Sequence, residues 1–138
     1  IRLHNRQALD DHPLRFKMDL IEGSSIDPAI IQQVHDRAKL AKRVLVSLDS
    51  NHTHAHVLGE LAAYANLVSV GSYCIVYDTV IEDLPAGSYP DRPWDVGNNP
   101  KTAVHQWLQS HPEFESDHAI DQKLLISVAP EGYLRRMR

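Results

Sequence analysis

The chain has 138 residues, of which 43% are hydrophobic and 23% are charged, and this composition fits one globular domain over residues 1–138. It excludes a disordered chain, a collagen-like chain and a disulfide-stabilised scaffold, and a formal net charge of −4 disfavours a nucleic acid or an anionic membrane as partner. A single cysteine, Cys74, predicts a reducing compartment and a cytoplasmic location. No apolar run reaches about 18 residues, so we expect no membrane span. We also expect no signal peptide.

The first half of the chain predicts alternating strands and helices. Residues 2–11 favour at most a short helix, and residues 15–22 alternate apolar with charged side chains, which predicts a half-buried strand. Asp27 and Pro28 are typical of a helix start, and that helix is expected to end near Lys42. Residues 44–48 predict a strand buried on both faces, and residues 57–65 are spaced as a helix.

The second half begins with another β-rich run, over residues 67–78. Residues 80–100 predict a long loop on the substrate side, because four prolines interrupt the stretch and loops of this length are usually functional. A helix is expected over 102–110. Residues 123–129 and 133–137 then predict a terminal hairpin around a Pro-Gly turn.

This order of elements predicts an α/β fold with an open, mostly parallel sheet and an antiparallel C-terminal hairpin. Strands separated by helices pair in parallel through right-handed crossovers. In such sheets ligands bind at the carboxyl ends of the strands, so the polar residues that follow the strands are the candidates for a site.

Two of the expected strands end on an acid, Asp49 and Asp78. Carboxylates are costly to bury unpaired, so packing explains them poorly. Together with Thr79 they would form an oxygen-rich set that suits Mg²⁺. The alternative is that each acid only caps the turn that follows it.

The run His52, His54 and His56 is the most conspicuous local pattern. His52 and His56 are four residues apart and could hold zinc on one helix face, but no third ligand completes such a site. His52 stands beside Asp49 at a helix start, where the helix dipole favours a neutral imidazole, so it is the candidate general base. The alternative for all three is a set of solvated histidines at a helix start.

Other sources of chemistry are not apparent. The sequence contains no nucleophile elbow, Walker loop or dinucleotide-binding glycine motif. Cys74 lies inside an apolar run and is expected in the core. Trp94 and Trp107 are expected to be packing residues, although Trp94 lies in the long loop and could line a pocket.

Five strings of the sequence together carry a family resemblance, namely SSID, LVSLDSNHTHAHVLGEL, SVGSYCIVYDTVIEDLP, NPKTAVHQWL and LLISVAPEGYLRR. They resemble the cephalosporin hydroxylase-like group of S-adenosylmethionine-dependent methyltransferases, which includes rhamnosyl O-methyltransferases. The resemblance covers the chain from about Ile1 to its end. The segments around Asp49 and Asp78 are its most specific parts, and they also resemble, more distantly, catechol O-methyltransferase-type enzymes.

The resemblance implies a Rossmann-like methyltransferase domain and gives roles to single residues. Ser24, Ser25 and Ile26 would lie against the adenine of S-adenosylmethionine, and Asp49, Asp78 and Thr79 would hold Mg²⁺. His52 falls where the catechol-type enzymes place a lysine base.

Because the chain begins at Ile1, we expect it to be the C-terminal part of that domain, without its first strand and glycine-rich loop. Tyr77 stands where relatives often carry a glutamate, which removes a carboxylate from the metal site.

The function implied is Mg²⁺-assisted O-methyl transfer to a small hydroxylated metabolite or a sugar. His52 or the carboxylate of Asp49 would take the acceptor proton. The alternative is a catalytically inactive module that keeps the fold for binding or assembly. A homo-oligomer is compatible with the sequence, which does not define the oligomeric state.

Overall fold

The computed structural model describes residues 3–138 and contains one four-stranded sheet. Its elements, in chain order, are α1 (Leu3–Asp10), η1 (Arg15–Lys17), α2 (Pro28–Ala38), β1 (Val46–Leu48), α3 (His54–Tyr64), η2 (Ala65–Leu67), β2 (Tyr73–Val76), η3 (Thr79–Asp83), α4 (Pro100–Leu108), β3 (Phe114–Ser116), α5 (His118–Leu124) and β4 (Tyr133–Arg136).

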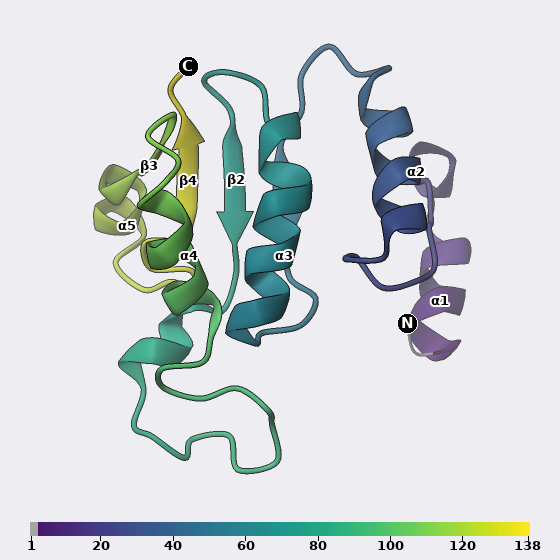
Figure 1. The fold of residues 1–138 in the computed structure, drawn as a ribbon. Coiled ribbons are helices and arrows are strands. Elements are labelled where there is room, and N and C mark those ends of the chain that lie inside the picture. Colours follow the sequence, from purple (N-terminus) through teal and green to yellow (C-terminus); the bar gives the residue numbers. More distant parts are fainter. Residues whose placement is uncertain (1–2) are drawn as a thin grey trace.

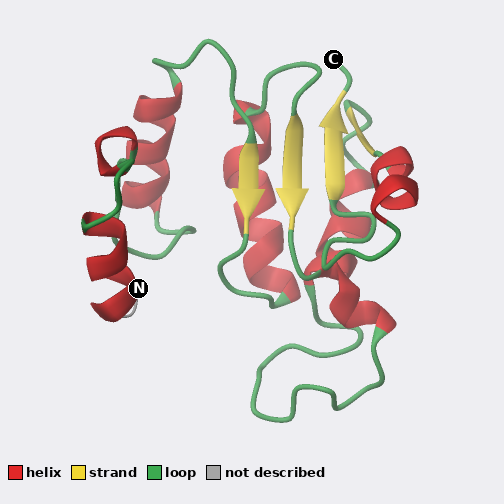
Figure 2. Cartoon of the chain, turned by 180° about the vertical axis from the view of Figure 1, so that it is seen from behind, coloured by secondary structure: helices red, strands yellow, loops and turns green. Residues whose placement is uncertain are grey.

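The sheet has the order β1-β2-β4-β3, with β1 parallel to β2 and with β4 antiparallel to both of its neighbours. Figure 2 shows β1 and β2 pointing to the same edge, beyond which the long loop extends. The chain thus has the expected α/β class and the expected open sheet with a parallel start and antiparallel strands, an arrangement compatible with a Rossmann-like fold.

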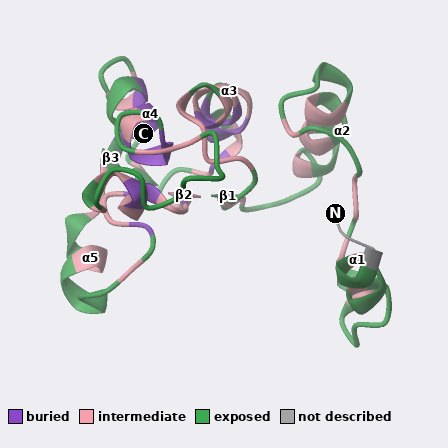
Figure 3. Ribbon diagram, turned by 90° about the horizontal axis from the view of Figure 1, so that it is seen from below, coloured by how far each residue is buried: buried purple, intermediate pink, exposed green. Residues whose placement is uncertain are grey.

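The core lies between one face of the sheet and the helices α3 and α4. Figure 3 shows the buried residues gathered there, with α5 on the opposite side of the sheet. The core side chains are those of Leu48, Val57, Leu61, Tyr64, Ala65, Val68, Cys74, Val76, Ala103, Val104, Trp107, Phe114 and Leu134. Trp107 and Cys74 are therefore core residues, as expected.

The helices α1 and α2 stand apart from the sheet, beyond the edge formed by β1 (Figure 1 and Figure 3). α2 begins as expected, with the Asp27 carboxylate accepting a hydrogen bond from the backbone N–H of Ala29 and with proline at its first turn. It ends at Ala38 rather than near Lys42, and none of its residues is fully buried. No helix within residues 3–138 is long and apolar enough to cross a membrane.

The strand expected over residues 15–22 is wrong. Arg15–Lys17 forms a turn of 3₁₀ helix, and the side chain of Phe16 is 79% exposed. Arg15 donates to the carboxylate of Asp10 and to the carbonyl of Met18, which favours a compact turn. An alternating pattern becomes a strand only beside another strand, and the described chain places none next to this segment.

The expected terminal hairpin is also wrong in one of its two strands. β4 forms where expected, but its partners are β2 and β3, so both of its edges are occupied. Residues 123–129 contain the end of α5 and a connection, in which the side chain of Ile126 is 93% exposed. β1 differs in a smaller way, because only Leu48 is buried and Ser47 is exposed.

Candidate active site

The two acids predicted as metal ligands follow neighbouring strands and lie at the same edge of the sheet. Leu48 of β1 pairs with Val76 of β2, and the backbone N–H of Tyr77 donates to the carbonyl of Leu48 over 3.0 Å. Asp49 and Asp78 come directly after these pairings. Asp78 has a φ of 56°, a left-handed conformation in which the chain turns sharply away from β2.

His52 lies between the two carboxylates. Its Nε2 is 3.1 Å from Oδ2 of Asp78 and 3.4 Å from Oδ1 of Asp49. The three residues each offer one ligand atom, and these atoms lie within 4.8 Å of one another. His52 and Asp78 are partly buried while Asp49 is exposed, so the cluster opens toward solvent on the side of Asp49. A set of two carboxylates and one imidazole fits a divalent cation.

The long loop covers this cluster with an aromatic side chain. The Trp94 ring lies over His52 with 4.7 Å between the ring centroids, and the Arg92 guanidinium lies 5.3 Å from the centroid of Trp94. His52 thus has two acids on one side and an indole on another. Trp94 lines the site, which is the second of the two roles considered for it from the sequence.

Hydrogen bonds hold both ends of this loop. The Glu82 carboxylate accepts from the backbone N–H of Gly97 over 2.8 Å and from the side-chain amide of Asn99. Asn98 Oδ1 accepts from the backbone N–H of His54, at the start of α3. The Asp95 carboxylate closes the loop by accepting from the backbone N–H of Gly87. These hydrogen bonds fix both ends of the loop and thereby help to position Trp94 beside His52.

Thr79, the third predicted metal ligand, is fully buried, and its hydroxyl donates to the carbonyl of Pro130 over 2.7 Å. Its hydroxyl proton is thus engaged by the protein. Ligation by Thr79 stays a prediction, and it would act through the lone pairs of the hydroxyl oxygen.

The other two histidines of the run have separate partners. His54 contacts α4, with Nδ1 2.8 Å from the Thr102 hydroxyl and Nε2 2.9 Å from the Gln106 side-chain oxygen. His56 Nε2 lies 2.9 Å from the Ser25 hydroxyl and 3.1 Å from that of Ser50. Because α3 starts at His54, His52 does not share its face with His56. Within residues 3–138 the histidine run forms no zinc site of its own.

The residues expected to hold the cofactor lie against α3. Besides the contact of Ser25 with His56, the carbonyl of Ser25 accepts from the Tyr64 hydroxyl. A side chain placed on Gly59 would approach Ile26 to 3.1 Å, so the helix and this segment are closely packed. The carbonyl of Ser24 accepts a hydrogen bond from the backbone N–H of Asp27, which closes a turn before α2.

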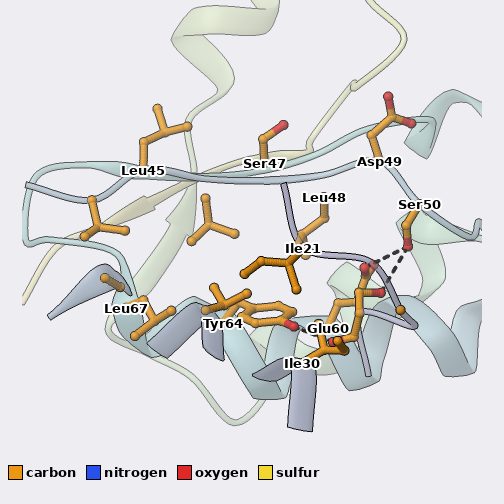
Figure 4. A pocket seen from close by; sticks show the side chains of 16 residues that line it. Ile21, Ile30, Leu45, Ser47, Leu48, Asp49, Ser50, Glu60, Tyr64 and Leu67 are labelled. Carbon is orange, nitrogen blue, oxygen red and sulfur yellow. Dashed lines mark hydrogen bonds between the residues drawn. The ribbon is translucent and has the colours of Figure 1, made fainter. Parts of the chain in front are cut away.

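A cavity of about 480 Å³ lies between this segment, α2 and β1. Figure 4 shows its lining, which is mostly apolar, with Asp49, Ser50 and Glu60 toward one end and Tyr64 near the middle. Ser50 donates to Glu60 Oε1 over 2.7 Å. Burial, with a further effect of the Glu60 charge, raises the pKa of Tyr64. The cavity thus joins an apolar wall to a polar end.

Glu60 and Tyr64 were not predicted as site residues. They follow His56 at intervals of four, so the three share one helix face. That spacing of polar side chains within an otherwise apolar helix is the signal that could have pointed to them.

A protein-family model described as rhamnosyl O-methyltransferase/CmcI matches residues 1–137. Among known proteins, the rhamnosyl O-methyltransferases of Mycobacterium bovis (strain BCG / Pasteur 1173P2) and Mycobacterium tuberculosis (strain ATCC 25618 / H37Rv) are each 30% identical over 136 residues, which are 96% of this chain and 53% of the relative. That of Mycobacterium leprae (strain TN) is 29% identical over 118 residues, or 84% of this chain and 49% of the relative. The chain thus spans about half the length of these relatives. No solved structure gave a significant match.

Proposed function

We propose that this chain, which belongs to the rhamnosyl O-methyltransferase/CmcI family, carries the acceptor-activating half of an O-methyltransferase that acts on a sugar hydroxyl. The observation that carries the proposal is the cluster of Asp49, His52 and Asp78 at the carboxyl ends of β1 and β2. That edge is where open α/β sheets bind their ligands.

The carboxylates of Asp49 and Asp78 are the proposed holders of a divalent cation, which we take to be Mg²⁺. Their oxygens are ligands that Mg²⁺ prefers, and the exposure of Asp49 leaves an open side for an acceptor. A divalent cation at this place supplies positive charge that lowers the pKa of an acceptor hydroxyl. Thr79 stays a candidate third ligand.

His52 is the proposed general base. Its Nε2 faces the cluster, so the neutral imidazole with its hydrogen on Nδ1 can accept at Nε2 the proton that the acceptor hydroxyl loses as the oxygen takes the methyl group. The acids beside it stabilise the imidazolium that results. Asp49, as the more exposed carboxylate, is the alternative proton acceptor.

The methyl donor we propose is S-adenosylmethionine, held on its adenine side by Ser24, Ser25 and Ile26. Two observations support this placement: Ser25 and Ile26 lie against α3, and the cavity beside them reaches Asp49 and Ser50 at the end of β1. The cavity and the Asp49 cluster would then hold the two reactants at one edge of the sheet. A cytoplasmic location remains a prediction, for which the free, buried Cys74 is the argument.

The test is methyl transfer from labelled S-adenosylmethionine to a rhamnose-bearing acceptor, measured on the complete protein that contains these 138 residues. Asp49→Asn and Asp78→Asn should each lower the rate about a hundredfold or more, because each removes a ligand charge that holds the proposed cation, whose positive charge stabilises the acceptor oxygen. Asp11→Asn, which changes an exposed acid after α1, should leave the rate unchanged. Full activity in both cluster variants would contradict the metal role.

His52→Gln separates the two roles open to the imidazole. If His52 is the base, the variant binds Mn²⁺, followed by electron paramagnetic resonance, as tightly as the wild type while kcat falls. If it is a third metal ligand, affinity for Mn²⁺ falls together with kcat. A protein that binds neither Mn²⁺ nor S-adenosylmethionine would instead be the inactive module considered from the sequence.

A further inference from the structure

We propose that Glu60 is a specificity-determining residue of the donor site and that it accepts a hydrogen bond from the exocyclic amino group of the adenine. The inference rests on the proposed function, because it concerns how the methyl donor is recognised. It starts from one buried oxygen atom for which residues 3–138 provide no hydrogen-bond partner.

Glu60 lies in the middle of α3, and only 2% of its surface is exposed. Its two oxygens have different surroundings. Oε1 accepts the hydroxyl of Ser50 over 2.7 Å, with Nε2 of His56 at 3.7 Å. Oε2 is buried and has no hydrogen-bond partner within the described chain. A carboxylate oxygen left in this state is costly, so a donor is expected to reach it.

The cavity is the open space beside this carboxylate. Glu60 is one of its lining residues, and its volume of about 480 Å³ is in the range of small-molecule sites. The remainder of the lining is largely aliphatic, with Ile21, Ile30 and Leu48 among its members (Figure 4). A slot with apolar walls and one polar end suits a flat heteroaromatic ring better than a sugar, whose many hydroxyls would be left without partners.

The chemistry of Oε2 determines which edge of such a ring can meet it. An ionised carboxylate only accepts hydrogen bonds, so the group that meets it must carry an N–H or O–H. Adenine presents an exocyclic amino group, whereas hypoxanthine presents a carbonyl oxygen at the same position. The carbonyl would face the carboxylate with no hydrogen between them, and a site of this kind discriminates strongly against the wrong group.

Neighbouring contacts place this carboxylate next to the segment expected to hold adenine. Ser25 contacts His56, one turn before Glu60 on α3, and its carbonyl accepts from Tyr64, one turn after. Gly59, directly before Glu60, packs against Ile26. The segment and Glu60 therefore meet at the polar end of the same cavity.

The test is isothermal titration of the complete protein with two probes, S-adenosylhomocysteine and its analogue in which hypoxanthine replaces adenine. The wild type should bind the adenine compound about ten- to a hundredfold more tightly. Glu60→Met removes the acceptor at similar length, so both compounds should bind within about threefold of each other. Glu115→Gln, on the exposed side of β3, should keep the wild-type ratio.

Glu60→Gln is the second variant, in case the methionine variant does not fold, as judged by its thermal melt. The glutamine amide can turn either its N–H or its oxygen to the ligand, so it too should lower the ratio. An unchanged ratio in a folded variant overturns the role of Glu60 while the donor site itself stands. If the wild type binds neither compound, the proposed donor site is wrong and the inference falls with it.

Discussion

Cys74 shows how strongly the core changes the chemistry of a single side chain. It lies in β2 with no exposed surface. Burial, with a further effect of the Glu60 charge, raises the pKa of its thiol from 9.0 to about 12. The thiolate is the reactive form of cysteine, so Cys74 is inert for two reasons, access and protonation.

We predict that iodoacetamide labels Cys74 in the native chain at pH 8 far more slowly than in the urea-unfolded chain. The pKa shift alone lowers the thiolate fraction about a thousandfold. Mass spectrometry of samples quenched over time measures both rates. Equal rates would show that β2 is not packed as described.

The same shift predicts a loss of stability at alkaline pH. Below pH 9 the thiol is protonated in both states and contributes nothing to the pH dependence. As the pH rises above 9 the unfolded chain loses the proton while the native chain keeps it until about 12, so the free energy of unfolding falls across that interval. Cys74→Ala should show a shallower alkaline decline, because the remaining groups titrate equally in both proteins.

The site shows which residues the sequence could identify. Asp49 and Asp78 were predicted because each ends an expected strand, and strand order brings such residues to one edge. His52 was predicted because it stands beside Asp49 at an expected helix start. Glu60 was missed because an acid on a helix is usually solvated, and only the fold shows that α3 buries it. The contact of Trp94 with His52 depends on a loop path that no local pattern encodes.

At the scale of elements, helices were predicted better than strands for a physical reason. A helix satisfies its own backbone, so signals such as Asp27-Pro28 identify its start locally. A strand depends on neighbours that lie far away in the sequence. Residues 15–22 have the right pattern and no partner within the described chain, whereas β3, with three residues, is too short for a pattern but pairs with β4.

At the start of α4, a single residue, Asn99, holds both the helix and the long loop. Asn99 is fully buried, and its side-chain oxygen accepts from the backbone N–H groups of Lys101 and Thr102, while the Thr102 hydroxyl accepts from the backbone of Asn99. Its amide group also donates to Glu82 and to the carbonyl of Asp95. One side chain thus caps the helix and fastens the long loop.

We therefore predict that Asn99→Ala lowers the free energy of unfolding by about 2 kcal/mol, at the upper end for a helix cap, since partners in the loop lose their bonds as well. Urea denaturation followed by circular dichroism measures the change. Asp27→Ala removes the cap of α2, where the carboxylate accepts only the backbone N–H of Ala29, and serves as the control, with an expected loss of about 1 kcal/mol or less. Equal losses would contradict the role of Asn99 in the loop.

At the scale of the whole molecule, the chain has two regions of unequal packing. The sheet with α3 and α4 contains most of the buried hydrophobic core, whereas α2 contains no buried residue. α2 and the segment before it are held partly by polar contacts to α3, such as the bond from His35 Nε2 to the carbonyl of Ala63 over 2.8 Å. Local opening is expected where few apolar contacts resist it.

Hydrogen exchange should reveal this difference. Amides of α1 and α2 in the ligand-free chain should exchange about a hundredfold faster than those of β2 and α3, because they can open without disturbing the main core. Exchange resolved by mass spectrometry after proteolysis measures the ratio. Uniform protection across the four elements would show that the chain opens as a single cooperative unit.

The position of the cavity between these two regions has a consequence for affinity. One wall, from Ile21 to α2, belongs to the loosely packed region, and the other, from β1 and α3, belongs to the core. A ligand there would bind only molecules in which both walls are in place, so its observed dissociation constant would be the intrinsic one divided by the fraction of such molecules. A bound ligand would in turn hold α2 against the sheet. Substitutions in α2 far from any bound atom would weaken binding only by lowering the fraction of molecules in which both walls are in place.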